Sequence, residues 1–259
     1  MKKNLRERHI EAVSIVIITL NEELNLPHIL GDLERQTTKN FEVIVVDSKS
    51  ADATVEVARS FINRLPLRIV EMPNKGVSLG RNTGASRARY ERLLFLDADT
   101  RLDVDFLEKS LEELEARRLQ IGGVYLKCRD AFSLSAAGMQ LFNGGLWLHQ
   151  RVFPMAAGGC LFSTRTAHDR VGGFDESIVL CEDCDYVRRA SKEYGLRFGM
   201  LRQKYYFHTR RLEQEGLLKM GKTYLRAYFH RMFAGELYGN PYRYRFAHYD
   251  NPEEVSSNG

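Results

Sequence analysis

Two aspartates that directly follow an apolar run are the residues of this sequence best suited to chemistry. The run Leu93 to Leu96 leads into Asp97-Ala98-Asp99. If the run is a strand, both carboxylates leave the same sheet edge while Ala98 turns away. Two hard oxygen ligands on a rigid edge suit Mg²⁺ or Mn²⁺, which neutralises a phosphate leaving group. The alternative is a pair of turn and helix-cap aspartates.

Acidic residues also follow two other apolar runs. The run 13–19 ends at Thr19 and continues into Asn21-Glu22-Glu23, and the run 42–47 ends at Asp47. Loops are polar in any protein, so one such residue would carry little information. Acidic residues after three of four predicted strands favour a common site.

The elements that must position these residues alternate in type along the chain. Near-continuous apolar runs at 13–19, 42–47, 67–72 and 92–97 are typical of parallel strands buried on both faces. Helical spacing separates them at 26–33, 55–62 and 76–89. This order predicts an α/β fold with an open, twisted, mostly parallel sheet flanked by helices. The ligand crevice of such a sheet lies outside the carboxyl ends of its strands.

The second half of the chain has a looser pattern. Asp105 and Glu108 have capping-box spacing and predict a helix that contains Leu107, Leu111 and Leu114. Strands are predicted at 122–127 and 158–164, on either side of a stretch rich in glycine and aromatic residues at 132–153. A helix over 181–195 and a strand at 204–208 follow. This half is predicted to form a second wall of one cleft.

Length and composition restrict the class of protein. The chain has 259 residues, of which 44% are hydrophobic and 28% charged, with only 6 prolines and 20 glycines. This suits one large globular domain and excludes disordered and collagen-like proteins. The longest apolar stretch, Val13 to Leu20, is far below the roughly 18–20 residues of a bilayer span, and the basic opening lacks a signal h-region. We therefore expect a cytoplasmic protein, with peripheral contact at the inner face of the membrane as an option.

The four cysteines are too few for a disulfide framework in a chain of this length. Cys181 and Cys184 form the one C-x-x-C pair, and no second pair accompanies it. We therefore expect packing thiols rather than a zinc or redox site.

Positive charge is concentrated near the carboxyl end. Between Arg202 and His248, ten Lys and Arg residues face three Glu residues, a net charge of +7 in a chain whose total is +4. From Leu217 to Phe233 the basic residues alternate with aromatic and aliphatic ones. This pattern is typical of interfacial helices and predicts contact with a membrane surface or a lipid-linked anionic acceptor. The alternative is an ordinary amphipathic helix packed on the domain, and no nucleic-acid motif accompanies the charge.

The ordered motifs TLNEE, VVDSKSADAT, NKGVSLGRNTG, LFLDADT, GGFDE and CEDCDY resemble those of the family 2 glycosyltransferases, which have a GT-A fold. The resemblance covers roughly residues 12–212. It implies a catalytic domain over 1–212, with a nucleotide and metal half at about 12–120 and an acceptor half at about 121–212. Residues 213–259 are then a basic, aromatic extension. Such enzymes are generally inverting and use nucleotide-diphospho-sugars and a divalent metal.

The resemblance also implies roles for single residues in donor binding. Asp47 corresponds to the carboxylate that accepts from the base, and Arg81 meets the diphosphate or supports the Asp-x-Asp turn. Ser50 belongs to the same loop as Asp47. It either contacts the nucleotide or only stabilises the fold of the loop. The full set of nucleotide-binding candidates is Leu20, Asn21, Glu22, Asp47, Ser50, Gly76, Arg81, Asp97 and Ala98.

Metal, acceptor and catalytic roles follow in the same way. Asp97 and Asp99 resemble the metal ligands, and His208 is either a third ligand, a contact to the diphosphate or only a polar cap of its strand. Asp183 resembles the general base for the acceptor hydroxyl, and Glu182 its partner, although the two roles are interchangeable on sequence. The remaining candidates, for phosphate or acceptor contact, are Arg210, Arg211 and Trp147.

These expectations define a metal-dependent, inverting glycosyltransferase of the hexosyltransferase type. It would move a sugar from a UDP- or GDP-linked donor to an acceptor hydroxyl, in polysaccharide, glycolipid or cell-surface glycan synthesis. Alternatives are a catalytically degenerate nucleotide-sugar-binding scaffold and a nucleotidyltransferase, although no glycine-rich phosphate loop follows the first strand. A dinucleotide-binding domain fails because G-x-G-x-x-G is missing there.

Overall fold

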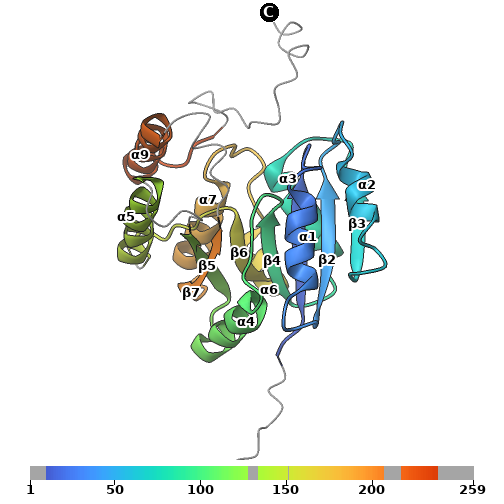
Figure 1. The fold of residues 1–259 in the computed structure, drawn as a ribbon. Helices are drawn as coiled ribbons and strands as arrows, with labels where there is room; N and C mark the ends of the chain where they lie inside the picture. The colour runs from blue at the N-terminus through green and yellow to red at the C-terminus, as the bar shows by residue number, and fades with distance from the viewer. Residues whose placement is uncertain (1–9, 128–133, 151, 207–216, 239–259) are drawn as a thin grey trace, which may run out of the picture.

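A seven-stranded sheet forms the centre of the protein (Figure 1). The computed structural model describes residues 10–127, 134–150, 152–206 and 217–238. The strand order is β3-β2-β1-β4-β6-β5-β7, and β6 runs antiparallel to both of its neighbours while the other pairs are parallel. This confirms the predicted α/β fold with a mostly parallel sheet. The strands are β1 (Val13–Thr19), β2 (Phe41–Asp47), β3 (Leu67–Glu71), β4 (Arg92–Asp97), β5 (Ile121–Lys127), β6 (Cys160–Thr164) and β7 (Phe198–Tyr206).

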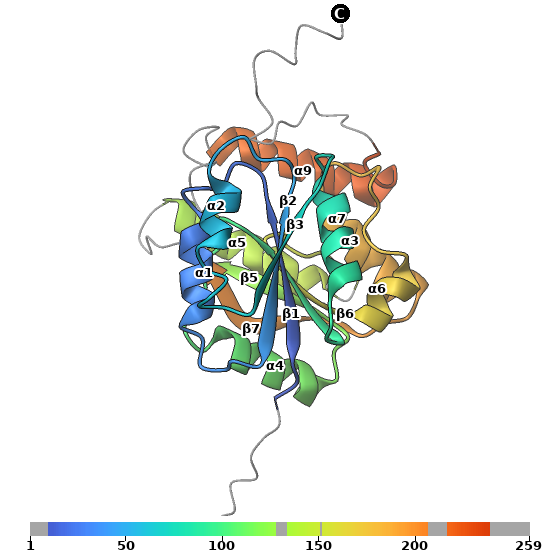
Figure 2. The ribbon, with the colours of Figure 1, turned by 90° about the vertical axis from the view of Figure 1, so that its right-hand side faces the viewer.

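Helices cover both faces of this sheet (Figure 2). One face packs against α1 (Leu26–Glu34), α2 (Thr54–Arg59), α4 (Phe106–Arg117) and α5 (Leu134–His149), and the other against α3 (Val77–Arg87), α6 (Arg165–Val171) and α7 (Glu182–Arg188). A turn of π-helix, Arg189–Glu193, extends α7. The last described helix is α9 (Leu217–Phe233).

Alternate residues of the central strands enter the two cores. Ile15 and Ile17 of β1 point into the core under α1 and α4, whereas Val16 points into the core under α3. All three side chains are fully buried. Burial on both faces is the physical reason why these strands appear as continuous apolar runs rather than as alternating ones.

The predicted helix after Asp105 is present, but the capping box expected from Asp105 and Glu108 does not form. No side-chain cap bond forms at Asp105, whose carboxylate pairs instead with Lys109. Glu108 accepts a hydrogen bond from the Thr37 hydroxyl at 2.6 Å. The spacing therefore predicted the start of α4 correctly, but the side chains of Asp105 and Glu108 bind Lys109 and Thr37 instead of capping the helix.

Two elements of the second half differ from the expected ones. Most of the glycine-rich stretch 132–153 forms a helix, α5, which the sequence did not predict because its hydrophobic residues follow no single stripe. Residues 204–206 of the predicted strand at 204–208 are the end of a longer strand, β7, which begins at Phe198, and residues 207 and 208 lie outside the described residues.

The direction of β6 decides which loop reaches the carboxyl edge of β4. Leu96 of β4 pairs with Cys160, the first residue of β6, and the Asp97 amide donates to the Gly159 carbonyl at 3.1 Å. A parallel strand in this place would bring its end to the edge, whereas β6 brings the loop before it. Gly158 and Gly159 therefore lie beside Asp97.

Candidate active site

Arg81 joins three segments that are far apart in the sequence. Its Nη1 donates to Glu182 Oε1 at 2.6 Å, and its Nη2 donates to Asp97 Oδ1 at 3.0 Å and to the Gly158 carbonyl at 3.1 Å. The arginine is 2% exposed and its guanidinium lies 5.2 Å from the centre of the Phe174 ring. The structure thus brings the ends of β4 and of the loop before β6 to the start of α7.

Charges in this cluster perturb one another. Burial acts to lower the pKa of Arg81, but Asp97, Glu182 and Asp183 outweigh it and raise that pKa. Loss of solvation raises the pKa of the Asp97 carboxyl, and Arg81 only partly counteracts this effect. One guanidinium therefore does not balance the surrounding carboxylates.

Asp183 is a third carboxylate whose charge acts on Arg81. It is 6% exposed at the start of α7, after Cys181, whose backbone is left-handed with φ 65°. Burial, with the adjacent Cys184 and Glu182, raises the pKa of Asp183 well above its usual range. A methyl group at Gly158 would lie 3.5 Å from its Oδ2, so this carboxylate faces the glycine. A carboxyl with raised proton affinity is suited to accepting a proton.

Tyr205 of β7 is a buried phenol within electrostatic reach of three candidate carboxylates. Burial raises the pKa of this phenol well above its usual range, and the charges of Asp97, Asp183 and Asp99 raise it further. The side chain is 1% exposed. The charges of Asp97, Asp99 and Asp183 therefore all act on the same buried phenol.

The predicted nucleotide side lies at the same edge, because β1 is paired with both β2 and β4. Asp47 accepts from the Thr19 hydroxyl at 3.0 Å, from the Ser50 hydroxyl at 2.5 Å and from the Ser50 amide at 2.9 Å. The backbone of Asn21 is left-handed, with φ 54°. Its side-chain oxygen accepts a hydrogen bond from the Ala51 amide at 2.8 Å. The loops after β1 and β2 thus form one hydrogen-bonded unit.

Glu22 and Leu20 belong to this unit as well. Leu20 and Glu22 are both 8% exposed. The Glu22 amide donates to the Thr54 hydroxyl at 2.8 Å, and its carboxylate accepts from Asn25 at 2.6 Å. Its charge also contributes to the raised pKa of Asp97.

The donor set fits a divalent cation. Asp97 is 36% exposed at its side chain, and Asp99 is partly exposed after the buried Ala98. Both offer hard oxygen atoms in a region with excess negative charge. Within the described ranges no three His, Cys, Asp or Glu side chains come close enough to hold a metal by themselves. Oxygen atoms of a ligand or of water would complete the coordination.

The remaining candidates are two residues within the described structure and three outside it. His208, Arg210 and Arg211 lie outside the described residues. Trp147 is 64% exposed on α5. Gly76 precedes α3 with φ 164°, which is extended backbone, and a methyl group there would come to 3.1 Å from Leu79 Cβ.

Three residues at the site were not singled out from the sequence. Gly158 supplies the carbonyl that Arg81 binds, and a methyl group at Gly159 would come to 3.0 Å from the Tyr205 hydroxyl. Asn82 bonds both the amide and the carbonyl of Phe174, at 2.8 and 2.9 Å. The Gly-Gly pair at the start of the predicted strand 158–164 was the signal that could have pointed to this close packing.

Of the cysteines that the structure describes, Cys160 and Cys184 are buried, and Cys128 lies outside the described residues. Cys160, Cys181 and Cys184 carry free thiols, and Cys184 donates to the Ala156 carbonyl at 3.2 Å. Burial raises the pKa of Cys160 well above its usual range. Thiols that are this poorly ionised do not favour metal or redox chemistry.

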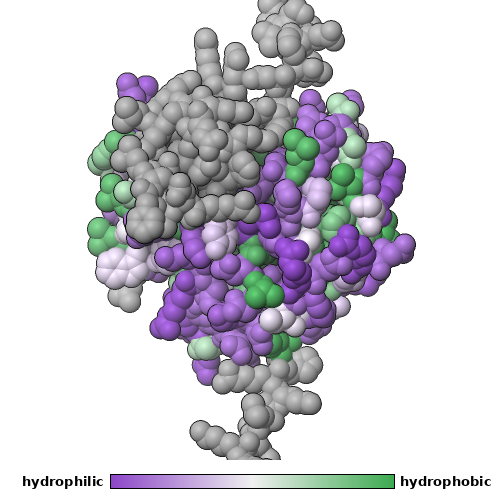
Figure 3. Space-filling view, in the orientation of Figure 1, coloured by the Kyte–Doolittle hydropathy of each residue, from purple (hydrophilic) through white to green (hydrophobic). Residues whose placement is uncertain are grey.

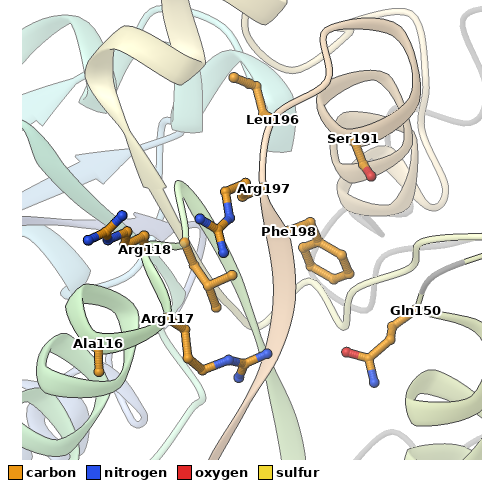
Figure 4. A pocket seen from close by; sticks show the side chains of 9 residues that line it. Ala116, Arg117, Arg118, Gln150, Ser191, Leu196, Arg197 and Phe198 are labelled. Atoms are coloured by element: carbon orange, nitrogen blue, oxygen red, sulfur yellow. The ribbon is translucent and has the colours of Figure 1, made fainter.

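A cavity of about 790 Å³ lies at the opposite edge of the sheet (Figure 4). It is lined by residues at the end of α4 and before β7, among them Arg117, Arg118 and Arg197. These segments precede the amino ends of β5 and β7. The cavity is therefore separate from the carboxylate cluster.

The fold and this edge of the sheet define a class of protein, the glycosyltransferases with a GT-A fold. The mannosyltransferase PcManGT from Pyrobaculum calidifontis, solved with GDP-Man and Mn²⁺, has a TM-score of 0.68 and 20% identity over 85% of this chain and 65% of that one. TarS 1-349 from S. aureus, solved with UDP, has a TM-score of 0.63 and 19% identity over 86% of this chain and 72% of that one.

The chain belongs to glycosyl transferase family 2, whose family model matches residues 14–158. Among curated relatives, the validoxylamine A glucosyltransferase of Streptomyces hygroscopicus subsp. limoneus is 42% identical over 93 residues, which are 34% of this chain and 20% of that protein. In this and three similar matches, the chain spans between 20% and 33% of the relative's length. The predicted family and fold are therefore confirmed.

Proposed function

We propose that the chain is a metal-dependent, inverting glycosyltransferase that moves a hexose from a UDP- or GDP-sugar to an acceptor hydroxyl. Synthesis of a polysaccharide, a glycolipid or a cell-surface glycan is the setting we propose for it. The observation that carries the proposal is the Arg81 guanidinium, which joins Asp97 at the end of β4 to Glu182 at the start of α7, next to Asp183. The solved neighbours with GDP-Man and Mn²⁺ and with UDP support a nucleotide-sugar donor.

In this proposal the loops after β1 and β2 bind the nucleoside. Asp47 accepts from the base, and Ser50 and Asn21 hold the loop in which Asp47 lies. Leu20, Glu22, Gly76 and Ala98 shape the remainder of the nucleotide site. Asp97 and Asp99 hold Mn²⁺ or Mg²⁺, which when bound supplies positive charge for the diphosphate leaving group.

Asp183 accepts the proton of the acceptor hydroxyl, which then attacks the sugar directly from the side opposite the diphosphate. The raised pKa of Asp183 supports this role, because a stronger base takes the proton more readily. Glu182 is engaged by Arg81 and is better suited to positioning than to proton transfer. His208, Arg210, Arg211 and Trp147 remain candidates for contacts to metal, phosphate or acceptor.

The test replaces Asp183 with an isosteric amide. Asp183→Asn should lower kcat by about 10²–10⁴-fold, while the affinity for UDP or GDP, measured by calorimetry, stays close to that of the unaltered protein. A hydrolysis screen over nucleotide sugars with Mn²⁺ supplies the donor. Unaltered turnover in Asp183→Asn would show that the base lies elsewhere, and an equal loss of donor affinity would assign Asp183 to the metal or the phosphates.

Two matched variants separate proton transfer from stability. Glu182→Gln should retain more activity than Asp183→Asn, but it should unfold more easily because Arg81 loses a buried partner. Asp185→Asn changes a buried acid of the same helix that pairs with Arg189 at 2.7 Å. It should affect stability and leave the kcat of the folded protein unchanged.

A further inference from the structure

Two neighbouring helices, α5 and α9, carry large apolar side chains that face solvent. Trp147 is 64% exposed, Leu141 81% and Phe233 79%. We define the α5–α9 face by these and the adjacent exposed residues. It consists of Leu141, Trp147 and Leu148 of α5, Val152 after it, and Leu225, Phe229, Met232 and Phe233 of α9. A cluster of this kind on a protein surface is typical of an interaction site.

The exposed residues of α9 occupy one side of the helix. With 100° between successive residues, the four apolar ones fall within about 120° of the circumference. Lys222 and Arg226 are exposed in the same arc. Ala227 and Arg231 are buried on the other side, 0% and 5% exposed. The helix therefore turns a broad apolar stripe with basic residues outward, although its inner side already packs on the protein.

Aromatic contacts hold the two helices together. Tyr228 of α9 lies edge-to-face with His149 of α5 at 5.7 Å and with Phe153 at 5.9 Å. The helices lie side by side in Figure 1, and in Figure 3 apolar surface gathers at the margin of the molecule near α5. These contacts therefore place the exposed apolar residues of α5 and α9 on neighbouring parts of the surface.

The charges near this face decide which partner fits it. The segment Leu217–Phe233 contains no Asp or Glu, and α5 has His149 as its only ionisable side chain. Arg231 is buried and pairs with Glu236 at 2.6 Å, whereas Lys222 and Arg226 are exposed. In a symmetric pair of chains joined through this face, one cation-bearing surface would meet another of the same kind, which is unfavourable.

We propose that the α5–α9 face docks on a membrane surface rich in anionic lipid. Apolar and aromatic side chains would enter the boundary between headgroups and acyl chains, while Lys222 and Arg226 remain at the level of the anionic headgroups. In the described ranges, none of the helices combines the length and the apolar character that crossing a bilayer requires, so the contact is peripheral. The proposal is independent of the proposed catalytic activity.

Docking by this face would place the acceptor side of the site close to the lipid. Ala227, on the inner side of α9, packs with Leu180 and Leu237, and Cys181 packs against this cluster. Cys181 directly precedes Glu182 and Asp183. A hydroxyl carried by a lipid-linked molecule could then reach the site from the membrane.

The single tryptophan of the chain reports on this docking directly. Trp147 lies on the α5–α9 face, so the emission of the full chain should shift to the blue when phosphatidylcholine vesicles with phosphatidylglycerol are added. Brominated acyl chains in the same vesicles should quench it. Vesicles of phosphatidylcholine alone should give a much smaller effect, and added salt should weaken the binding.

Variants of exposed residues distinguish docking from misfolding. Leu225→Ser/Phe229→Ser/Phe233→Ser should weaken vesicle binding about ten-fold or more, and Lys222→Gln/Arg226→Gln about five-fold per residue removed. The control Ile62→Ser/Val104→Ser changes exposed apolar residues on other elements, 48% and 54% exposed, and should bind like the unaltered chain. Circular dichroism verifies that each variant is folded.

Three results would overturn the proposal. One is no blue shift and no sedimentation with anionic vesicles. The second is equal binding by the α9 variants and the unaltered chain. The third is a blue shift that depends on protein concentration without vesicles, together with a dimer in light scattering, which would assign the face to a second copy of the chain.

Discussion

Removal of the Arg81 guanidinium should cost the protein much of its stability. In Arg81→Met the stem keeps its approximate volume, but Glu182 and Asp97 lose a charged donor and the Gly158 carbonyl loses a hydrogen bond. Loss of one partner from a buried ion pair typically costs about 3–5 kcal/mol. The Asp97 side chain is 36% exposed, so water compensates part of its share, and we expect about 3 kcal/mol at pH 7.

The same variant should show a characteristic pH dependence. Arg81 lowers the pKa of Asp97 and Asp183, so its removal raises both values further in the folded state. A carboxyl whose pKa is higher in the folded than in the unfolded protein stabilises the fold while it is protonated and loses this contribution as pH rises. The destabilisation of Arg81→Met should therefore be largest at neutral pH and should decrease toward pH 5.

Urea unfolding followed by circular dichroism at pH 7 and pH 5 measures both effects. Arg81→Lys keeps the charge but not the two-pronged geometry, so it should lie between Arg81→Met and the unaltered chain. Arg64→Met removes an arginine from the exposed pair with Glu34 and serves as the control, with a stability close to that of the unaltered chain. A loss below about 0.5 kcal/mol for Arg81→Met would refute the role of the cluster, and a loss independent of pH would assign it to packing against Phe174.

Three further predictions concern metal, packing and protonation. The affinity for UDP or GDP in calorimetry should fall sharply in EDTA, because Asp97 and Asp99 would face the diphosphate with like charge; equal affinity would remove the metal role. Gly84→Ala should destabilise the fold by about 1–3 kcal/mol, because its methyl group would come to 2.2 Å from Val16 Cγ1. In urea titrations, the double variant Gly84→Ala/Val16→Ala should lose less stability than the two single variants lose together. Burial lowers the pKa of His168 from 6.5 to about 4, so stability should fall as pH drops through that window, by about 3 kcal/mol at most; His168→Phe should flatten this slope in thermal melts from pH 7 to 4.

Much of the fold could be predicted because local patterns and tertiary burial agree there. The strands 13–19 and 92–97 have the predicted bounds, since an apolar run between polar ends leaves little freedom of register. Helix α5 could not be predicted, because glycines and scattered aromatic residues give it neither a stripe nor a cap. The antiparallel direction of β6 depends on pairing with β4 and β5, and no local pattern encodes it.

The site was predictable in its residue types and less so in its connections. Asp47 and Asp97 stand where parallel strands end, so their common edge follows from topology alone. That Arg81 would engage Glu182, 101 residues away, depends on the position of α7 and on the carbonyl of Gly158. The ion pair with Arg81 distinguishes Glu182 from Asp183, whereas the sequence alone does not say which of the two is the base.

The place of β6 in the sheet has a consequence for the newly made chain. Strand β6 completes the edge of β4. Strand β5 is synthesised after β4 and before β6, but it pairs with β6 and β7 and so leaves the edge of β4 open. About 60 residues must therefore leave the ribosome after Leu93-Leu94-Phe95-Leu96 before this apolar edge finds its neighbour. An unpaired apolar strand edge is a template for association between chains. We expect nascent chains that end before Cys160 to depend on chaperones more strongly than the finished protein does.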